Sequence, residues 1–204
     1  MGFYGEQILP RVVDKLLGNR EFAKVRKEAC TGLHGDVVEI GFGSGLNVPF
    51  LPDAVAGVWA VEPSQVAWKL AAKRVAQSRV PLHQAGLDGA RLDLPDARFD
   101  AALSTMTLCT IPDVGAALHE IRRVLKPGAE FHFAEHGHAP DHQVARRQDR
   151  FNGVQNRVAG GCNLNRDITA LLTAAGFVVD PIRNFYLKGP KPVGYMYVGR
   201  ARNP

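Results

Sequence analysis

Cysteine is scarce in this sequence of 204 residues, and a long apolar run is missing altogether. The three cysteines, Cys30, Cys109 and Cys162, are odd in number and widely spaced, which argues against a disulfide framework and favours a reducing compartment. No apolar run reaches the roughly 20 residues that a helix needs to span a bilayer. Charged residues from Glu6 onward interrupt the N-terminus, so a signal peptide is not expected. We therefore expect a cytoplasmic protein.

The sequence also lacks internal repeats, low-complexity linkers and dense Lys/Arg runs with interleaved aromatic residues. We therefore expect a single domain over residues 1–204, long enough to build a full core. A nucleic-acid partner is not expected. The formal net charge of +5 is mild. It fits either a solvated basic surface or weak peripheral contact with an anionic membrane.

The stretch 36–47 is the one around which the rest of the chain is organised. Its apolar run at 37–40 is typical of a strand that is buried on both faces. Gly41, Gly43 and Gly45 then alternate with other residues before a helix can begin. Glycine lets backbone N–H groups approach a ligand because no Cβ intervenes. The stretch therefore predicts a strand, a glycine turn and a helix that together cradle a nucleotide-type ligand.

The glycine spacing narrows the choice of ligand. A dinucleotide fingerprint, G-x-G-x-x-G, would need its third glycine at Leu46, but that glycine comes one residue early, at Gly45. Glu39 lies two residues before the first glycine, where a carboxylate suits positive charge and hydroxyls better than a pyrophosphate. S-adenosylmethionine (SAM) carries a sulfonium, an ammonium and a ribose diol. We therefore predict SAM as cofactor and S-adenosylhomocysteine as product, with a nicotinamide-dependent oxidoreductase as the alternative.

Two further acids fall where such a cofactor would lie. Glu62 ends a strand expected at about 57–61 and lies some 20 residues past the glycine turn. A carboxylate at this place can accept hydrogen bonds from both ribose hydroxyls. Asp88 follows a strand expected at about 80–85 and is assigned to the adenine amino group; the alternative is a polar surface loop. The other residues assigned to the cofactor line the turn, the adenine ring or the end of the fourth strand: Phe42, Asn47, Pro63, Leu87, Gly89, Ser104 and Thr105.

Apolar periodicity and breakers divide the whole chain into three parts. Residues 1–30 are expected to form a helical lid, 31–136 the SAM-binding core, and 137–204 a helical acceptor cap followed by a terminal strand pair. The expected helices cover about 5–30, 47–51, 64–77, 113–125, 143–158 and 164–174. The remaining expected strands cover about 101–105, 131–135, 177–180 and 194–200.

Four ordered motifs carry a family resemblance. They are EIGFGSG at 39–45, Glu62-Pro63, LPD with FD at 94–100, and EIRRVLKPG at 120–128. Together they resemble the type 11 branch of the class I SAM-dependent methyltransferases, which includes the quinone-biosynthesis C-methyltransferases. The resemblance spans about residues 30–136. It implies a Rossmann-like α/β fold with a seven-stranded sheet in the order 3-2-1-4-5-7-6, strand 7 antiparallel, and helices on both faces.

The C-terminal part resembles a more particular group. The segments EHG at 135–137, RQ at 147–148 and GCNLNR at 161–166 are similar to the methyltransferase-like group that includes microsomal alkyl-thiol S-methyltransferases. Those animal proteins carry an N-terminal membrane segment, which we do not expect here. The resemblance implies a small, fairly apolar acceptor, and a thiol is the first candidate. A quinone or another C- or O-acceptor is the alternative, and a SAM-binding regulatory or scaffold protein is the non-enzyme alternative.

Methyl transfer is an in-line displacement, so the enzyme mainly has to align the reacting atoms and exclude water. His136 is the candidate catalytic residue, because an imidazolium lowers a thiol's pKa and a neutral imidazole accepts its proton; the alternative is a hydrogen bond that orders a loop. Phe3, Tyr4 and Cys162 are assigned to the substrate pocket, with a loosely packed end and an inert buried thiol as alternatives. No metal site is expected, because the histidines at 132–142 and Cys162 have no clean ligand spacing.

Overall fold

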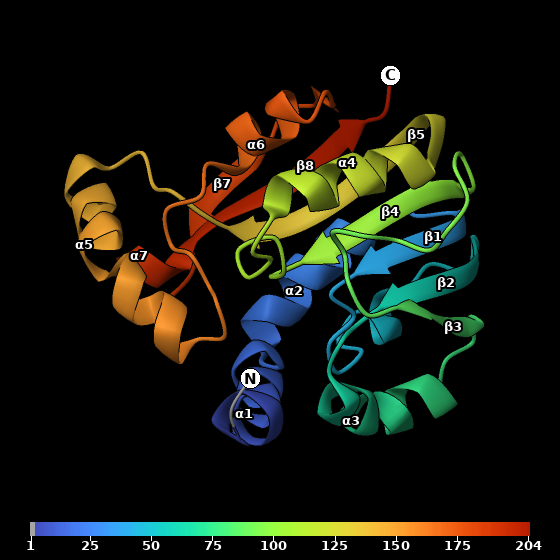
Figure 1. Cartoon of the computed structure of the whole chain (residues 1–204), viewed down its shortest axis with the longest axis horizontal. Coiled ribbons are helices and arrows are strands. Elements are labelled where there is room, and N and C mark those ends of the chain that lie inside the picture. The colour runs from blue at the N-terminus through green and yellow to red at the C-terminus, as the bar shows by residue number, and fades with distance from the viewer. Residues whose placement is uncertain (1–2) are drawn as a thin grey trace.

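Short apolar strands that alternate with helices build one twisted sheet, as the computed structural model shows for residues 3–204 (Figure 1). The strands are β1 (Gly35–Ile40), β2 (Val55–Val61), β3 (Leu82–Gly86), β4 (Phe99–Thr105), β5 (Leu125–His136), β6 (Val178–Val179), β7 (Arg183–Tyr186) and β8 (Tyr195–Arg202). The helical elements are η1 (Tyr4–Ile8), α1 (Leu9–Leu17), α2 (Arg20–Cys30), η2 (Val48–Phe50), α3 (Gln65–Ala76), α4 (Val114–Val124), α5 (His142–Val158), α6 (Ile168–Ala174) and α7 (Lys191–Gly194).

The sheet has the strand order β3-β2-β1-β4-β5-β8-β6. The first five of these strands pair in parallel, whereas β8 runs antiparallel to both β5 and β6. This confirms the predicted class I order, with β8 in the place of the seventh strand. The short strand β7 also pairs with β8 and was not predicted, because its sequence RNFY is brief and only half apolar.

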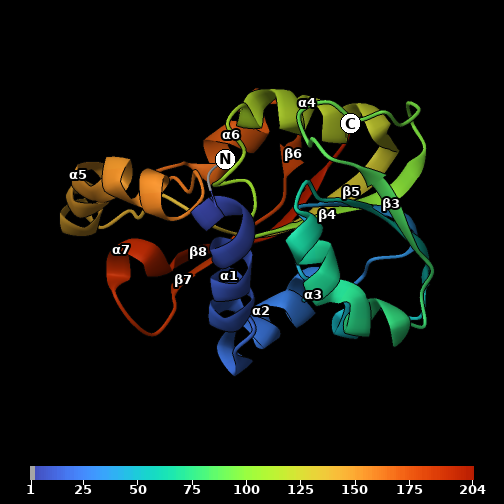
Figure 2. The same cartoon turned by 60° about the horizontal axis from the view of Figure 1, so that its bottom comes forward.

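The strand period of two distributes side chains between two helical layers. From β1, Val38 and Ile40 pack into a cluster with residues of α4 and α6, while Val37 packs with residues of α2. Figures 1 and 2 show α4 and α6 on one face of the sheet and α2 and α3 on the other. By the same alternation Glu39 lies on the face that α2 covers.

Side-chain caps explain where the helices begin. Ser64 accepts a hydrogen bond from the Ala67 amide, which confirms its predicted role as the N-cap of α3. The helix expected from Leu164 was wrong at its start, because it begins only at Ile168. The Leu164 amide instead donates to the Asn152 side chain, and Asp167 caps α6 by accepting from the Ala170 amide. The segment before α6 is therefore a loop that is pinned to α5.

Other boundaries also differ from the expectation. β5 begins at Leu125 rather than at 131, because Leu125 already pairs with Phe99 of β4. The helix expected at 47–51 is a single 3-10 turn, η2. The four-residue helix α7 was missed, since its sequence KPVG carries no helical apolar pattern. Between residues 3 and 204, no helix combines the length and the apolarity that crossing a membrane requires.

Candidate functional site

A cavity of about 340 Å³ opens at the carboxyl ends of β1, β2 and β4. This edge is where open α/β sheets bind ligands. The lining residues come from the glycine turn, from the ends of the strands, from α1 and from the loops that follow β3, β4 and α5. Nine of the residues assigned to the cofactor lie on its wall: Gly41, Phe42, Gly43, Glu62, Pro63, Leu87, Asp88, Gly89 and Thr105.

Glu62 joins the ends of the first two strands. Its Oε2 accepts from the Gly43 amide and its Oε1 from the Ser64 amide, both at 2.8 Å. Burial raises the pKa of this carboxyl, while the two amide bonds oppose the rise. Each carboxylate oxygen has two acceptor sites, so both oxygens keep capacity for a further donor. The carboxylate is thus held in one orientation on the cavity wall and is still able to bind hydroxyl groups.

The glycine turn needs glycine where the chain passes the β4 loop. Gly41 has a φ of +76°, and a Cβ there would overlap the Thr107 side chain. Gly89 approaches from the other side, since a Cβ on it would lie 2.8 Å from Ile40 Cγ2. The glycine turn therefore abuts the loop after β4, and the loop after β3 abuts the end of β1, with no space for a further side chain at either contact.

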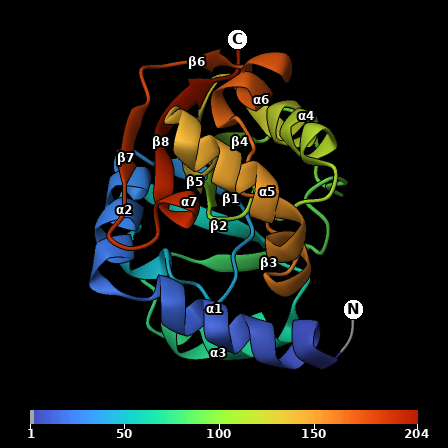
Figure 3. The same cartoon turned by 90° about the vertical axis from the view of Figure 1, so that its left-hand side faces the viewer.

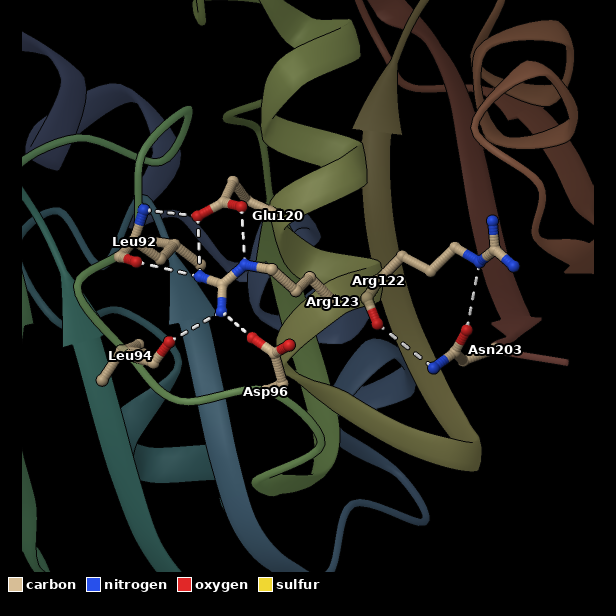
Figure 4. Close-up of polar contacts among 7 residues, drawn as sticks. All are labelled: Leu92, Leu94, Asp96, Glu120, Arg122, Arg123 and Asn203. Carbon is tan, nitrogen blue, oxygen red and sulfur yellow. Dashed lines mark hydrogen bonds and ion pairs between the residues drawn. The ribbon is translucent and has the colours of Figure 1, made fainter.

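Asp88 lies on the wall in the loop after β3, and its Oδ1 accepts a hydrogen bond from the Ala90 amide. The rest of this loop is clamped to α4 (Figure 4). Arg123 donates to the carbonyl groups of Leu92 and Leu94 and to the Asp96 carboxylate. Glu120 accepts two bonds from Arg123 and one from the Leu92 amide. The motif residues Glu120 and Arg123 thus fix the loop that carries Asp88.

Behind the wall, a polar network connects α2 with β1. Arg26 donates to Asn47 Oδ1 at 3.0 Å and to Thr105 Oγ1 at 2.6 Å. Asn47 in turn donates to Glu39 Oε1 at 2.7 Å. Burial raises the pKa of Glu39 to about 7, although its bond from Asn47 and the charge of Arg26 both lower it. Arg26 also lines the cavity, and its Nε is buried without a hydrogen-bond partner.

The N-terminal helix α1 forms one side of the cavity and runs beside α3 (Figure 3). Its wall residues are apolar: Leu9, Pro10, Val13 and Leu17. Asp14 secures the helix, because its Oδ1 accepts from the Ser44 hydroxyl at 2.6 Å and from Arg74 at 2.9 Å. The expected lid is therefore in contact with the glycine turn and with α3.

His136 ends β5, and its Nε2 lies 3.0 Å from Cys162 Sγ. Cys109, from the loop after β4, is the third member of this buried cluster. Hydrogen bonding to Cys109, and then to His136, lowers the pKa of Cys162 to about 4. The same contact raises the pKa of Cys109. None of the three residues is on the cavity wall, so the predicted catalytic role of His136 stays a prediction.

The other predicted residues are distributed as follows. Glu39, Gly45, Asn47 and Ser104 lie behind the wall rather than on it, and Ser104 donates to Glu135 at 2.7 Å. Phe3, Tyr4 and Cys162 are also off the wall, and Phe3 is 75% exposed. Tyr4 donates to the Val158 carbonyl at 2.9 Å and so joins η1 to the end of α5.

Sequence reasoning missed several wall residues, chiefly Arg26, Met106, Thr107, Thr110 and Ile111. A signal was present for Arg26 alone. It shares a helical face with Phe22, Ala29 and Cys30, and a cation on an otherwise apolar face needs a buried partner.

We expect Arg123→Ala to loosen the loop 87–98, because five hydrogen bonds from one guanidinium are lost. Hydrogen exchange of the Leu92 amide should become about tenfold faster, which corresponds to about 1.4 kcal/mol of local opening free energy. Arg122→Ala is the matched control, because Arg122 points the other way and bonds Asn203 (Figure 4). Equal exchange of this loop in both variants would contradict the clamp.

We also expect Glu39 to make stability depend on pH. Its folded pKa of about 7 is above the usual 4.5, so the folded state binds the proton more tightly than the unfolded chain does. The free energy of unfolding should then fall as pH rises from about 4.5 to 7, by at most about 1.4 kcal/mol per unit. Glu39→Gln keeps the acceptor for Asn47 and removes this slope. Denaturant titrations across that range measure it, and parallel profiles for the two proteins would contradict the assignment.

Comparison with known proteins agrees with this geometry. The family model Methyltransf_11, described as a methyltransferase domain, matches residues 38–133. Human thiol S-methyltransferase TMT1B is 29% identical over 193 residues, which cover 89% of this chain and 77% of the relative. Among the rat and human TMT1A and TMT1B proteins, the chain spans 61% to 77% of the relative's length.

A second relative matches a shorter part. The ubiquinone/menaquinone biosynthesis C-methyltransferase UbiE of Caulobacter vibrioides is 38% identical over 99 residues, covering 48% of this chain and 37% of the relative. A solved SAM-dependent methyltransferase from Thermotoga maritima has the same fold, with a TM-score of 0.66 and 22% identity over 98% of this chain and 100% of that one. The family match and the TMT1 thiol S-methyltransferase relatives support a class I SAM methyltransferase with TMT1-like similarity, and the solved structures share its fold.

Proposed function

We propose that the protein transfers the methyl group of SAM to the sulfur of a small, apolar thiol, and that the cofactor lies in the cavity at the ends of β1, β2 and β4. The observation that carries the cofactor assignment is the Glu62 carboxylate, which two backbone amides hold on the cavity wall beside the glycine turn. Its free acceptor sites suit the two vicinal hydroxyls of a ribose.

The other charges of the wall match the remaining parts of SAM. Asp88 supplies an acceptor for the adenine amino group, and Leu87 and Gly89 flank it on the wall. Arg26 supplies a cation for the methionine carboxylate, and its unpartnered buried Nε has a donor to spare. When bound, SAM supplies the electrophilic methyl group. The protein holds the donor, keeps water out and aligns the acceptor.

The apolar part of the wall supports a small, fairly apolar acceptor. The cavity lining includes Leu9, Val13 and Leu17 of α1 and, from the loop after β4, Ile111 and Pro112. An aliphatic thiol fits such a wall, and its pKa of about 8.5 leaves a usable thiolate fraction near neutral pH. No base is assigned to the reaction, since His136 is bonded to Cys162 instead.

The UbiE and TMT1B relatives match different lengths of this chain, and this difference affects the choice of acceptor. The match to UbiE covers 48% of the chain, whereas the match to TMT1B covers 89% and so includes most of the residues after β5. Those residues include Ala159 and Gly160, which line the cavity from the end of α5. The longer match therefore favours a thiol over the quinone alternative, even though its identity is lower.

Glu62→Gln tests the cofactor assignment. Removing the charge while keeping the shape should weaken SAM binding about tenfold to a hundredfold, because a hydrogen bond to a charged group contributes about 1.5–3 kcal/mol. Isothermal titration calorimetry with SAM and with NAD measures the effect and separates the two cofactors. Glu28→Gln, at an exposed ion pair with Arg183, is the control and should bind SAM as the wild type does. Unchanged affinity in Glu62→Gln would contradict the proposal.

A panel of acceptors tests the reaction. With SAM present, we expect methylation of small alkyl thiols at least about tenfold faster than that of quinols or amines, since only the thiol supplies a thiolate near neutral pH. Mass spectrometry of the methylated products measures the rates. Preferential methylation of quinols would establish the alternative acceptor. Tight SAM binding without any turnover would instead identify a regulatory or scaffold protein.

A further inference from the structure

Three sulfur and nitrogen side chains from distant parts of the sequence meet beside the cavity. Cys109 lies in the loop after β4, His136 ends β5, and Cys162 lies in the loop after α5. Their sulfur and ring-nitrogen atoms all lie within 4.8 Å of one another. A backbone hydrogen bond joins the two cysteine loops, because the Asn163 amide donates to the Cys109 carbonyl at 2.9 Å.

The donor set has a recognisable chemistry. Two thiols and one imidazole are ligands that zinc prefers, with Zn–S distances of about 2.3 Å and Zn–N distances of about 2.0–2.1 Å. Around one tetrahedral ion, such ligand atoms stand about 3.5 Å apart. The 3.0 Å between His136 Nε2 and Cys162 Sγ and the 4.8 Å limit for the whole cluster bracket that value.

The cluster is buried, and its hydrogen bonds are incomplete. The exposed fractions of Cys109, His136 and Cys162 are 2%, 4% and 8%. The Nδ1 atom of His136 is buried without any partner. Nε2 is the ring nitrogen that faces Cys162, so the ion would bind at Nε2 and leave Nδ1 as the N–H of the neutral ring. Two thiolates and a neutral imidazole around a divalent cation form a neutral unit, which burial penalises little.

We propose that Cys109, His136 and Cys162 bind one divalent cation of the zinc class, with a fourth position left for water or another small ligand. The sequence predicted no metal, because it considered the histidines at 132–142 with Cys162 and left out Cys109. The inference goes beyond methyl transfer and does not require it. Thr110 and Gly160, which adjoin two of the ligand loops, line the cavity, so the ion would fix that wall.

Cobalt titration of the reduced full-length protein tests the site without cofactor or acceptor. We expect about one Co²⁺ per chain, with the intense visible and charge-transfer absorption of a tetrahedral thiolate complex, and displacement of Co²⁺ by Zn²⁺. Cys109→Ser and Cys162→Ser should each weaken binding at least about tenfold and remove or shift the charge-transfer bands. Cys30→Ser is the matched control, because Cys30 is also buried but lies at the end of α2, in the cluster that packs against the sheet.

A second measurement does not depend on any variant. Zn²⁺ should raise the thermal midpoint of the wild type, and a chelator should reverse the rise. Binding well below one ion per chain, or a cobalt spectrum that Cys162→Ser leaves unchanged, would overturn the site. So would a zinc-independent thermal midpoint. Because SAM is absent from these experiments, a negative result leaves the proposed methyl transfer unaffected.

Discussion

The hydrogen bond from the Gly43 amide to the Glu62 carboxylate joins the ends of two parallel strands. The amides of Gly41 and Phe42 also donate to the Val61 carbonyl, so the whole glycine turn rests on the last residues of β2. A buried carboxylate is stable there only because backbone donors replace its lost hydration. The same amides that stabilise Glu62 therefore give the cavity its floor, and the loops around it are positioned against that floor.

A second set of buried charges determines how the N-terminal helices approach this floor. Glu39 lies next to the carboxyl end of β1 on the face that α2 covers, and Asn47 links it to Arg26. An uncompensated carboxylate at that position would be costly, so α2 must present a cation opposite it. Helix α1 ends directly before the break at Gly18-Asn19 and α2 begins directly after it, so the place of α1 over the cavity is tied to the position of α2.

Sequence reasoning succeeded where the signal was local. The run at 37–40, the glycine spacing and the phase of Glu62 at the end of β2 are short-range patterns, and they placed Gly41, Gly43 and Glu62 on the cavity wall. The sheet order was implied by the family resemblance. It failed where contacts join distant segments. Arg26 reaches Thr105 across 79 residues, and Asp14 reaches Arg74 across 60. The helix expected from Leu164 was displaced by a side chain of α5, a contact that no local pattern encodes.

The residues proposed to bind the methyl donor lie in local sequence patterns, whereas those proposed to contact the acceptor are brought together by contacts between distant segments. In the proposed function, the donor would lie against strand ends whose positions the ladder of the sheet fixes, and a fold-fixed site of this kind can serve different acceptors. The acceptor would lie against α1 and the loops after β4 and α5, which meet through side chains. Ser44 with Asp14, Tyr4 with Val158, and the Cys109 cluster are such contacts. Identity over the donor half therefore carries less information about the acceptor than a weaker match that includes these loops.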